Sequence, residues 1–433
     1  MSCFRPGLSE RQLSPHKSRP FPLLLSPSLP PPHHWHYRIE GAQKIVFSNA
    51  PNHPPNVLLL SAVKNHPAAP LQPLTNLSQA LFRRHLSPYL LPHHIVSLTP
   101  AYIKHLSQHA TPFRPPHRRA ASHISPHNRA ASLFPDVAFH FGPNTTLVEI
   151  KPKAALLSRS RLIPPHVASA LKKYTTPPYH IKNYLMLNGS LPHRPYIPSH
   201  LLCDDIPTVS SAISSLLTDN SRGLRVFRAG EPCNPEHHLS ELRAAAHAIV
   251  IDNACAQGIV AIQSADLIDN MGAEIIMRHL IRRVGEQQAT KLLRKSLYTY
   301  HAIPHLDEIT YKSSQQAAQL HDDAQYNSAV KAARTLPVTT AVHLLSGFLQ
   351  AAAAKDCSIM IALCKANEVK HTTPDCIIVE VQGVQWAAKL WVIDTDEKHT
   401  AKILGKWGVD DRKRASMLGS IISSSSGASQ HIT

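Results

Sequence analysis

Runs of apolar residues divide the second half of the chain into helices and strands. The segment "PVTTAVHLLSGFLQAAAA" is apolar around most of a helical circumference and predicts a buried helix, which leads into an apolar strand, "CSIMIAL". Two alternating segments, "CIIVEVQ" and "WAAKLWVID", meet at Gly383 and predict a β-hairpin. The segment "SADLIDNMGAEIIMRHLIRRVG" has apolar residues at helical intervals and predicts an amphipathic helix with a basic outer face and Ser264 as its N-cap.

Proline interrupts the pattern in the first half of the chain. The segments "WHYRIEGAQKIVF" and "NVLLLSAV" predict the strands of a hairpin around Gly41, and "LSQALFRRHL" and "PAYIKHLSQHA" predict short helices between proline-rich loops. A further apolar segment, "TTLVEI", runs directly into the basic "KPK". The order of sheet, basic segment, helices, hairpin and second basic segment is typical of an α+β fold.

The two ends of the chain lack apolar periodicity. Residues 1–34 are rich in proline, serine and histidine and predict a disordered tail, and residues 416–433 predict a flexible one. No apolar run approaches the ~20 residues that a membrane span needs. We therefore expect an intracellular protein without membrane insertion.

The charged residues say most about the kind of partner that the protein binds. Lys and Arg number 45 against 28 Asp and Glu, so the formal net charge is +17. Such an excess indicates an anionic partner: nucleic acid, an acidic membrane or a polyphosphate. The seven cysteines show no repeated spacing and indicate free thiols in a reducing compartment. Cys233 with His237 and His238 has a loosely metal-like spacing, which we interpret as a histidine-rich loop.

Two stretches could contain catalytic groups at strand ends. Glu149, Lys151 and Lys153 share one face of a strand under the two-residue period, and Pro152 between the lysines suits a strand end. A lysine-protected edge strand is the alternative interpretation. Asp356 stands between an alanine-rich helix and an apolar strand, where a turn or helix-terminal aspartate is the alternative.

The last basic segment places lysines after a pair of carboxylates. Asp394 and Asp396 end the strand "KLWVI", and Lys398, Lys402 and Lys406 recur every four residues after it. That spacing stacks three ammonium groups on one helical face, which an anion would relieve. A solvated basic face is the alternative.

In this combination and order the motifs "YRIEGAQKIVF", "RPPHR", "VEIKPK", "LRVF", "AKDCSIMI" and "VIDTDEK" resemble the inositol-pentakisphosphate 2-kinase family. That family transfers the γ-phosphate of ATP to the 2-hydroxyl of inositol pentakisphosphate and makes inositol hexakisphosphate, or phytate. The resemblance implies a two-lobed inositol-polyphosphate-kinase-like fold distantly related to protein kinases, with an N-terminal sheet lobe at 35–143 and a larger C-terminal α+β lobe at 144–415. It also implies ATP and Mg²⁺ as cofactors, a monomer, and a place in the nucleus or cytoplasm.

The resemblance further implies roles for individual residues. Catalytic roles fall on Asp356 and Lys151. ATP binding falls on Gly41, Ala42, Glu149, Arg225 and Asp394, and Asp394 would also hold magnesium. Inositol phosphate binding falls on Arg118, Lys153, Lys398, Lys402 and Lys406.

Leu59, Met186, Arg222 and Gly223 depart from the family pattern, and so do Lys402 and Lys406, which stand where an arginine and a tyrosine are expected. They leave open a second hypothesis, a degenerate member that binds inositol phosphates or a protein partner without turnover. A third hypothesis, a basic nucleic-acid-binding protein, is favoured only by charge, because the basic residues are dispersed and few aromatic residues lie among them.

Overall fold

The computed structural model describes residues 29–40, 44–49, 56–61, 63–64, 80–124, 130–186, 195–218, 223–299, 306–369, 375–395, 398 and 400–428. The chain packs as two compact units: unit 1 is Met1–Leu77 with Leu91–His140, and unit 2 is Ser78–Leu90 with Phe141–Thr433. Both units combine helices with antiparallel sheet, so the fold is α+β. The expected lobe limits stay predictions, with the difference that residues 78–90 pack in the second unit.

Unit 1 is built on a five-stranded antiparallel sheet. Its strands, in spatial order, are β1 (Trp35–Glu40), β2 (Lys44–Asn49), β3 (Asn56–Ser61), β7 (Ala130–Pro135) and β5 (His94–Ser97). A two-stranded ribbon of β4 (Val63–Lys64) and β6 (Ser122–His123), the helices α2 (Pro100–Ala110) and α3 (Pro116–Ala121) and the short helices η1 (Pro32–His34), η3 (Thr111–Phe113) and η4 (Val137–Phe139) complete it. The core joins Ile103 and Leu106 of α2 to Trp35, Phe47 and Leu58 of the sheet.

The predicted hairpin of unit 1 contains one strand more than expected. The segment "WHYRIEGAQKIVF" supplies both β1 and β2, which pair on either side of Gly41, and "NVLLL" forms a third strand, β3, beside β2. Gly41 and Ala42 lie outside the described residues. The predicted helix "PAYIKHLSQHA" is confirmed as α2, which Thr99 caps by accepting a hydrogen bond from the Tyr102 N–H.

Unit 2 contains a six-stranded sheet with every neighbouring pair antiparallel. Its strands, in spatial order, are β10 (Glu231–Cys233), β9 (Leu224–Arg228), β8 (Thr146–Ile150), β11 (Ser358–Lys365), β13 (Val384–Ile393) and β12 (Ile377–Val381). All five residues of β8 are buried, and β8 lies between two other strands. The edge-strand alternative for "VEIKPK" is therefore wrong.

The predicted hairpin around Gly383 is confirmed. Strands β12 and β13 pair in register from Val381 and Val384, and a two-residue loop joins them. Gln382 and Gly383 both have positive φ, 54° and 77°, as a type I′ turn requires.

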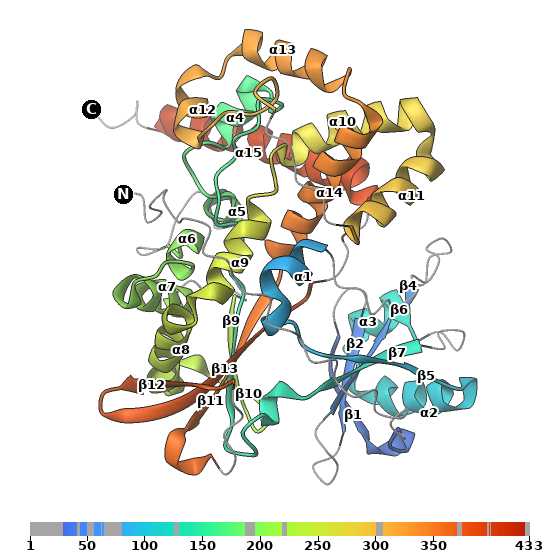
Figure 1. Ribbon diagram of the computed structural model, residues 1–433, viewed down its shortest axis with the longest axis vertical. Helices are drawn as coiled ribbons and strands as arrows, with labels where there is room; N and C mark the ends of the chain where they lie inside the picture. The colour runs from blue at the N-terminus through green and yellow to red at the C-terminus, as the bar shows by residue number, and fades with distance from the viewer. Residues whose placement is uncertain are drawn as a thin grey trace. The chain divides into compact units, whose positions relative to one another are not determined.

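Helices cover this sheet and extend beyond it (Figure 1). The α-helices of unit 2 are α1 (Ala80–Leu86), α4 (Pro165–Ala170), α5 (Pro178–Met186), α6 (Pro198–Leu201), α7 (Ile206–Thr218), α8 (Leu239–Ile251), α9 (Asn253–Gln263), α10 (Asp269–Val284), α11 (Glu286–Leu297), α12 (Ser314–Leu320), α13 (Asp323–Ala333), α14 (Val338–Ala354) and α15 (Gly408–Ala428). Short helical turns are η2 (Ser87–Tyr89), η5 (Pro235–His238), η6 (Ala366–Glu368) and η7 (Ile403–Trp407). Helix α8 packs across β8, β11, β12 and β13, and α14 is mostly buried, as predicted.

The amphipathic segment "SADLIDNMGAEIIMRHLIRRVG" is helical only from Asp269, so the expected N-cap at Ser264 is wrong. Ser264 follows the last residue of α9, and its hydroxyl donates to the Ala261 carbonyl. Ile268 occupies the N-cap position without a side-chain cap, and the Asp266 carboxylate stabilises the turn before the helix by accepting hydrogen bonds from the N–H groups of Ile268 and Asp269.

The C-terminal segment also differs from the expectation. Lys398 precedes the helix that begins at Ala401, and Ile403–Trp407 is a π-helical turn, so the four-residue lysine spacing does not make one helical face. Helix α15 continues to Ala428 with Leu418 buried, whereas a flexible tail was expected from residue 416.

Among the described residues, no single helix has both the length and the apolarity to cross a bilayer. Two bent pairs, Pro235–Ile251 with Asn253–Gln263 and Asp323–Ala333 with Val338–Ala354, reach those limits together by length and composition. Six cysteines are described, and each has a thiol rather than a disulfide.

Candidate functional site at one end of the six-stranded sheet

The register of the sheet brings separate segments of the chain to one end of it. Ile150, the last residue of β8, pairs with Leu224 at the start of β9 and with Ile359 at the start of β11. Ser358 pairs in turn with Ile393, the last residue of β13. Because antiparallel neighbours run in opposite directions, the residues after β8 and β13 lie beside those before β9 and β11.

Ser358 joins two charged groups at this end. Its hydroxyl donates a hydrogen bond to Glu149 Oε1 at 2.9 Å and accepts one from Lys151 Nζ at 2.9 Å. Arg225, the cross-strand partner of Glu149, places a guanidinium nitrogen 3.5 Å from Glu149 Oε2. Glu149 is 8% exposed, so its buried charge depends on these partners, and it holds Lys151 and Arg225 in place.

Asp394 lies on the other side of Lys151. Its carboxylate is 3.3 Å from Lys151 Nζ, and its side chain is about half exposed. Asp394 has φ of 59°, a left-handed conformation that costs a non-glycine residue roughly 1–2 kcal/mol. Such strain concentrates at functional sites, where the surrounding structure holds it in place.

Asp356 lies two residues after the end of α14 and forms an ion pair with Lys398. Lys398 Nζ donates to Asp356 Oδ2 at 2.8 Å. Burial alone would raise the pKa of Asp356, but the charge and hydrogen bond of Lys398 and the charges of Lys151 and Lys153 outweigh it and hold the pKa below its usual value. The turn interpretation of Asp356 is also met, because its N–H donates to the Ala353 carbonyl.

Lys153 completes the group, although not by the predicted alternation. Strand β8 ends at Ile150, and Lys153 has φ of 62°, so the two-residue period does not extend to it. Burial lowers the pKa of Lys153, as does the neighbouring charge of Lys151, while Asp356 partly offsets the change. The charge of Lys182 also lowers this pKa, so Lys182 lies within electrostatic reach. A bound anion would favour the charged form of Lys153 and oppose this shift.

We call these residues the strand-end cluster: Glu149, Lys151, Lys153, Arg225, Asp356, Ser358, Asp394 and Lys398. Seven of the eight were predicted from the sequence. Ser358 was missed because a serine that begins an apolar strand has no sequence signal apart from its neighbour Asp356. Gln263, a buried residue that contacts the backbone of Lys153, was missed because a single glutamine at the end of a helix has no sequence signal of its own.

The other predicted site residues remain predictions. Arg118 lies on α3 of unit 1, half-buried, and Arg114 donates to its carbonyl at 3.5 Å. Lys402 and Lys406 lie on the segment that packs against α10 and leads into α15.

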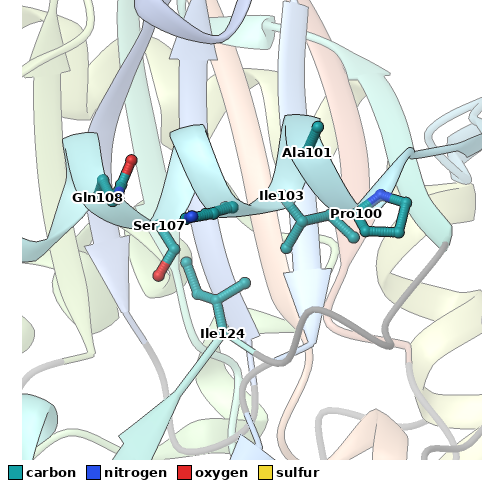
Figure 2. Close-up of a pocket in the computed structure, with 7 residues that line it drawn as sticks. Pro100, Ala101, Ile103, Ser107, Gln108 and Ile124 are labelled. Carbon is teal, nitrogen blue, oxygen red and sulfur yellow. The ribbon is translucent and has the colours of Figure 1, made fainter.

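A hollow of about 390 Å³ beside α2 in unit 1 is a different kind of site (Figure 2). Its lining is Pro100, Ala101, Ile103, Lys104, Ser107, Gln108 and Ile124. This lining contains one cation and no carboxylate, so it does not suit phosphoryl transfer, and we place the function in the strand-end cluster. In the described part of the chain, no group of three or more His, Cys, Asp and Glu side chains could hold a metal ion.

Three carboxylates, Glu149, Asp356 and Asp394, lie among four cations at the ends of adjacent strands, an arrangement that suits the class of enzymes that transfer a phosphoryl group between polyanions. The sequence model of the inositol-pentakisphosphate 2-kinase family matches residues 37–413, which is most of the chain. The protein belongs to this family, and a kinase acting on inositol phosphates follows at the family level. None of the curated proteins matches the chain.

The departures from the family pattern lie at varied places. Leu59 stands in the middle of β3, paired with Val46 and Ser132. Met186 is exposed at the end of α5, four residues from Lys182. The Gly223 carbonyl accepts a hydrogen bond from the Lys151 N–H at 2.8 Å and so anchors the strand-end cluster, whereas Arg222 lies outside the described residues.

Proposed function

We propose that the protein transfers the γ-phosphoryl group of ATP to the 2-hydroxyl of inositol pentakisphosphate and produces inositol hexakisphosphate and ADP. The observation that supports this most is Asp356, a carboxylate among Lys398, Lys151 and Lys153. An acceptor with several phosphate groups needs cations on several sides, and its one free hydroxyl needs an acceptor for its proton. The cluster offers both.

Asp356 orients the acceptor hydroxyl and receives its proton. The hydroxyl oxygen forms the new bond to the γ-phosphorus, the bond between that phosphorus and the ADP oxygen breaks, and the proton passes through Asp356 to water. Because the pKa of Asp356 is lowered, it is a weak base, and most of its effect comes from placement. Lys398, which holds Asp356, is also near enough to contact a phosphate of the acceptor.

Lys151, Arg225 and Asp394 form the nucleotide side. Lys151 and Arg225 would contact the transferred and neighbouring phosphates, and Asp394 would hold magnesium. Kinases bind Mg²⁺ through one or two carboxylates together with the substrate phosphates, so a single half-exposed carboxylate at a strand end fits this donor set. Magnesium neutralises charge that develops on the transferred group.

The decisive experiment is an ATP-dependent assay on inositol pentakisphosphate. The full chain, ATP and Mg²⁺ should yield inositol hexakisphosphate, identified by anion-exchange chromatography, with an equal amount of ADP. Removal of magnesium by EDTA should stop the reaction. Inositol hexakisphosphate, which has no free hydroxyl, should not act as acceptor and is the control.

A second candidate is a member that binds inositol phosphates without turnover. The observation that favours it is Leu59, an apolar residue in the middle of β3 at a position that departs from the family pattern. Calorimetric titration with inositol hexakisphosphate separates the two candidates. Binding without product in the assay would select the binder, and product would exclude it.

A further inference from the structure

The loop that contains Lys153 is held by a side chain far away in the sequence. Gln263, the last residue of α9, is 1% exposed. Its Nε2 donates to the Lys153 carbonyl at 2.8 Å, and its Oε1 accepts from the Ala155 N–H at 2.9 Å. The amide therefore spans the backbone on both sides of Ala154.

The same amide reaches the segment of Asp356. Gln263 Nε2 also lies 3.4 Å from the carbonyl oxygen of Ala354, the last residue of α14 and two residues before Asp356. A primary amide has two N–H donors and one carbonyl acceptor, so a single side chain satisfies all three backbone groups. Gln263 thus links the backbone near the two residues that would face the acceptor.

Lys153 needs such an anchor more than its neighbours do. Asp356 lies two residues before β11, which begins at Ser358, whereas Lys153 lies three residues beyond the end of β8 in a left-handed conformation. On the other side of the loop, the Tyr196 hydroxyl donates to the Pro152 carbonyl at 3.1 Å. These two side chains hold a conformation that the sheet does not determine.

We propose that Gln263 is a positioning residue that sets the spacing between Lys153 and Asp356 and thereby the place of the acceptor hydroxyl. This inference rests on the proposed function, since it names the residue that aligns the same site. A displacement of about 1 Å in a reacting geometry can cost ~10²-fold in rate. Gln263 touches no reacting group and acts only through the backbone of the two segments.

The test compares two buried glutamines of unit 2. Gln263→Met removes the amide and keeps the side-chain volume, and Gln350→Met does the same to a 3% exposed glutamine whose amide bonds Leu81 N–H and Ser346 Oγ. We expect Gln263→Met to lower kcat by ~10–10²-fold and Gln350→Met to leave kcat within about threefold, at matched melting temperatures. Equal loss of kcat in both variants, or none in Gln263→Met, overturns the proposal.

A second pair of variants reports on Lys153 directly. If Gln263 acts through Lys153, then Gln263→Met should weaken inositol hexakisphosphate binding in the wild-type background but have little further effect on binding in Lys153→Ala. Additive losses would indicate a general structural role and overturn the proposal. Gln263→Asn, which keeps an amide one methylene shorter, serves for both measurements if the methionine variant does not fold.

The binding measurement also separates the two proposals. If the wild-type chain binds inositol hexakisphosphate but does not turn over pentakisphosphate, the proposed function fails, and the non-additive binding result still supports Gln263 as the residue that positions Lys153. If the wild-type chain binds neither compound, both proposals fail.

Discussion

Under the proposed function, Asp356 is the residue on which the chemistry of this site depends. It lies two residues after the end of α14, its carboxylate is paired with Lys398, and the charges of Lys151 and Lys153 contribute to its lowered pKa. A carboxylate in such surroundings stays ionised and can accept a hydrogen bond from a hydroxyl at neutral pH. A turn residue that only caps the chain would not need three lysines around it.

We expect Asp356→Asn to abolish most turnover and to preserve inositol phosphate binding. General-base help is typically worth ~10²–10⁴-fold, so kcat should fall by about that factor. Binding should persist or tighten, because the variant removes a negative charge beside a polyanion. Asp375→Asn is the matched control: Asp375 is an exposed aspartate paired with Lys389 at 3.7 Å in the same unit, and its loss should leave kcat unchanged.

Calorimetry and turnover on the same preparation separate the roles of Asp356. Near-normal turnover in Asp356→Asn would exclude the catalytic assignment. Loss of both binding and cooperative unfolding would assign a structural role instead.

At the scale of elements, a buried ion cluster fastens the C-terminal helix to the rest of unit 2. Lys173, just after α4, contacts Asp411 of α15 at 2.6 Å and Asp269 at the start of α10 at 3.1 Å. Burial by itself would lower the pKa of Lys173, but the two carboxylates have the larger effect, so the pKa of Lys173 is raised. Burial by itself would raise the pKa of Asp269, but the charge of Lys173 has the larger effect and holds that pKa below its ordinary value of 3.8.

We expect Lys173→Met to lower the free energy of unfolding by about 3–5 kcal/mol, because it removes the buried cation that Asp269 and Asp411 share and leaves Asp411 the more exposed Arg414 at 3.4 Å. Lys172→Met, at the exposed neighbouring lysine, should change it by less than about 0.5 kcal/mol. Urea unfolding of the full chain measures both. A loss of equal size in the two variants would contradict the role of the ion cluster.

The pH dependence of this difference has a defined sign. Because the folded pKa of Asp269 lies below its ordinary value of 3.8, its contribution to stability is present above about pH 4 and is lost as the pH falls through the lower folded value. In Lys173→Met, Asp269 loses this cation, so its folded pKa should be higher and less stability should be lost as the pH falls. The difference between the two proteins should therefore shrink as the pH falls from 7 to about 4.

At the scale of the whole molecule, a net charge of +17 attracts polyanions in general, and under the proposed function the strand-end cluster selects among them. The excess charge alone would serve nucleic acid as well as inositol phosphates. Only a set of cations at fixed positions discriminates a compact polyphosphate from a long polyanion. Substitution of a lysine in the cluster should therefore weaken inositol phosphate binding more than substitution of a lysine elsewhere.

We expect Lys398→Ala to raise the dissociation constant for inositol hexakisphosphate by ~10–10²-fold, since a hydrogen bond to a charged group contributes about 1.5–3 kcal/mol. Lys291→Ala, at an exposed lysine of α11, should raise it by less than about threefold. Ligand at 100 times its dissociation constant should stabilise the wild-type chain by about 2.7 kcal/mol. Equal effects of the two substitutions, or competition by duplex DNA at equal phosphate concentration, would favour the nucleic-acid hypothesis.

Local pattern was enough to determine many elements of this protein and many residues of its site. The apolar stretch of α14, the strand β11 and the hairpin at Gly383 have periods or turn residues that few other structures satisfy. Lys151, Asp356 and Asp394 were identifiable because each follows or precedes an apolar run, and a polar residue at such a junction lies at a strand end. The family motifs added Arg225 and Lys398.

Only the tertiary structure decided which of these junctions meet. The central place of β8, the pairing of Asp356 with Lys398, and the contacts of Ser358 with both Glu149 and Lys151 follow from strand order and register. Gln263 and Lys153 lie 110 residues apart in the chain and meet through packing of α9. A period of 2 or 3.6 residues specifies which face of an element is buried but not which element covers it, so buried polar contacts of this kind are settled by packing.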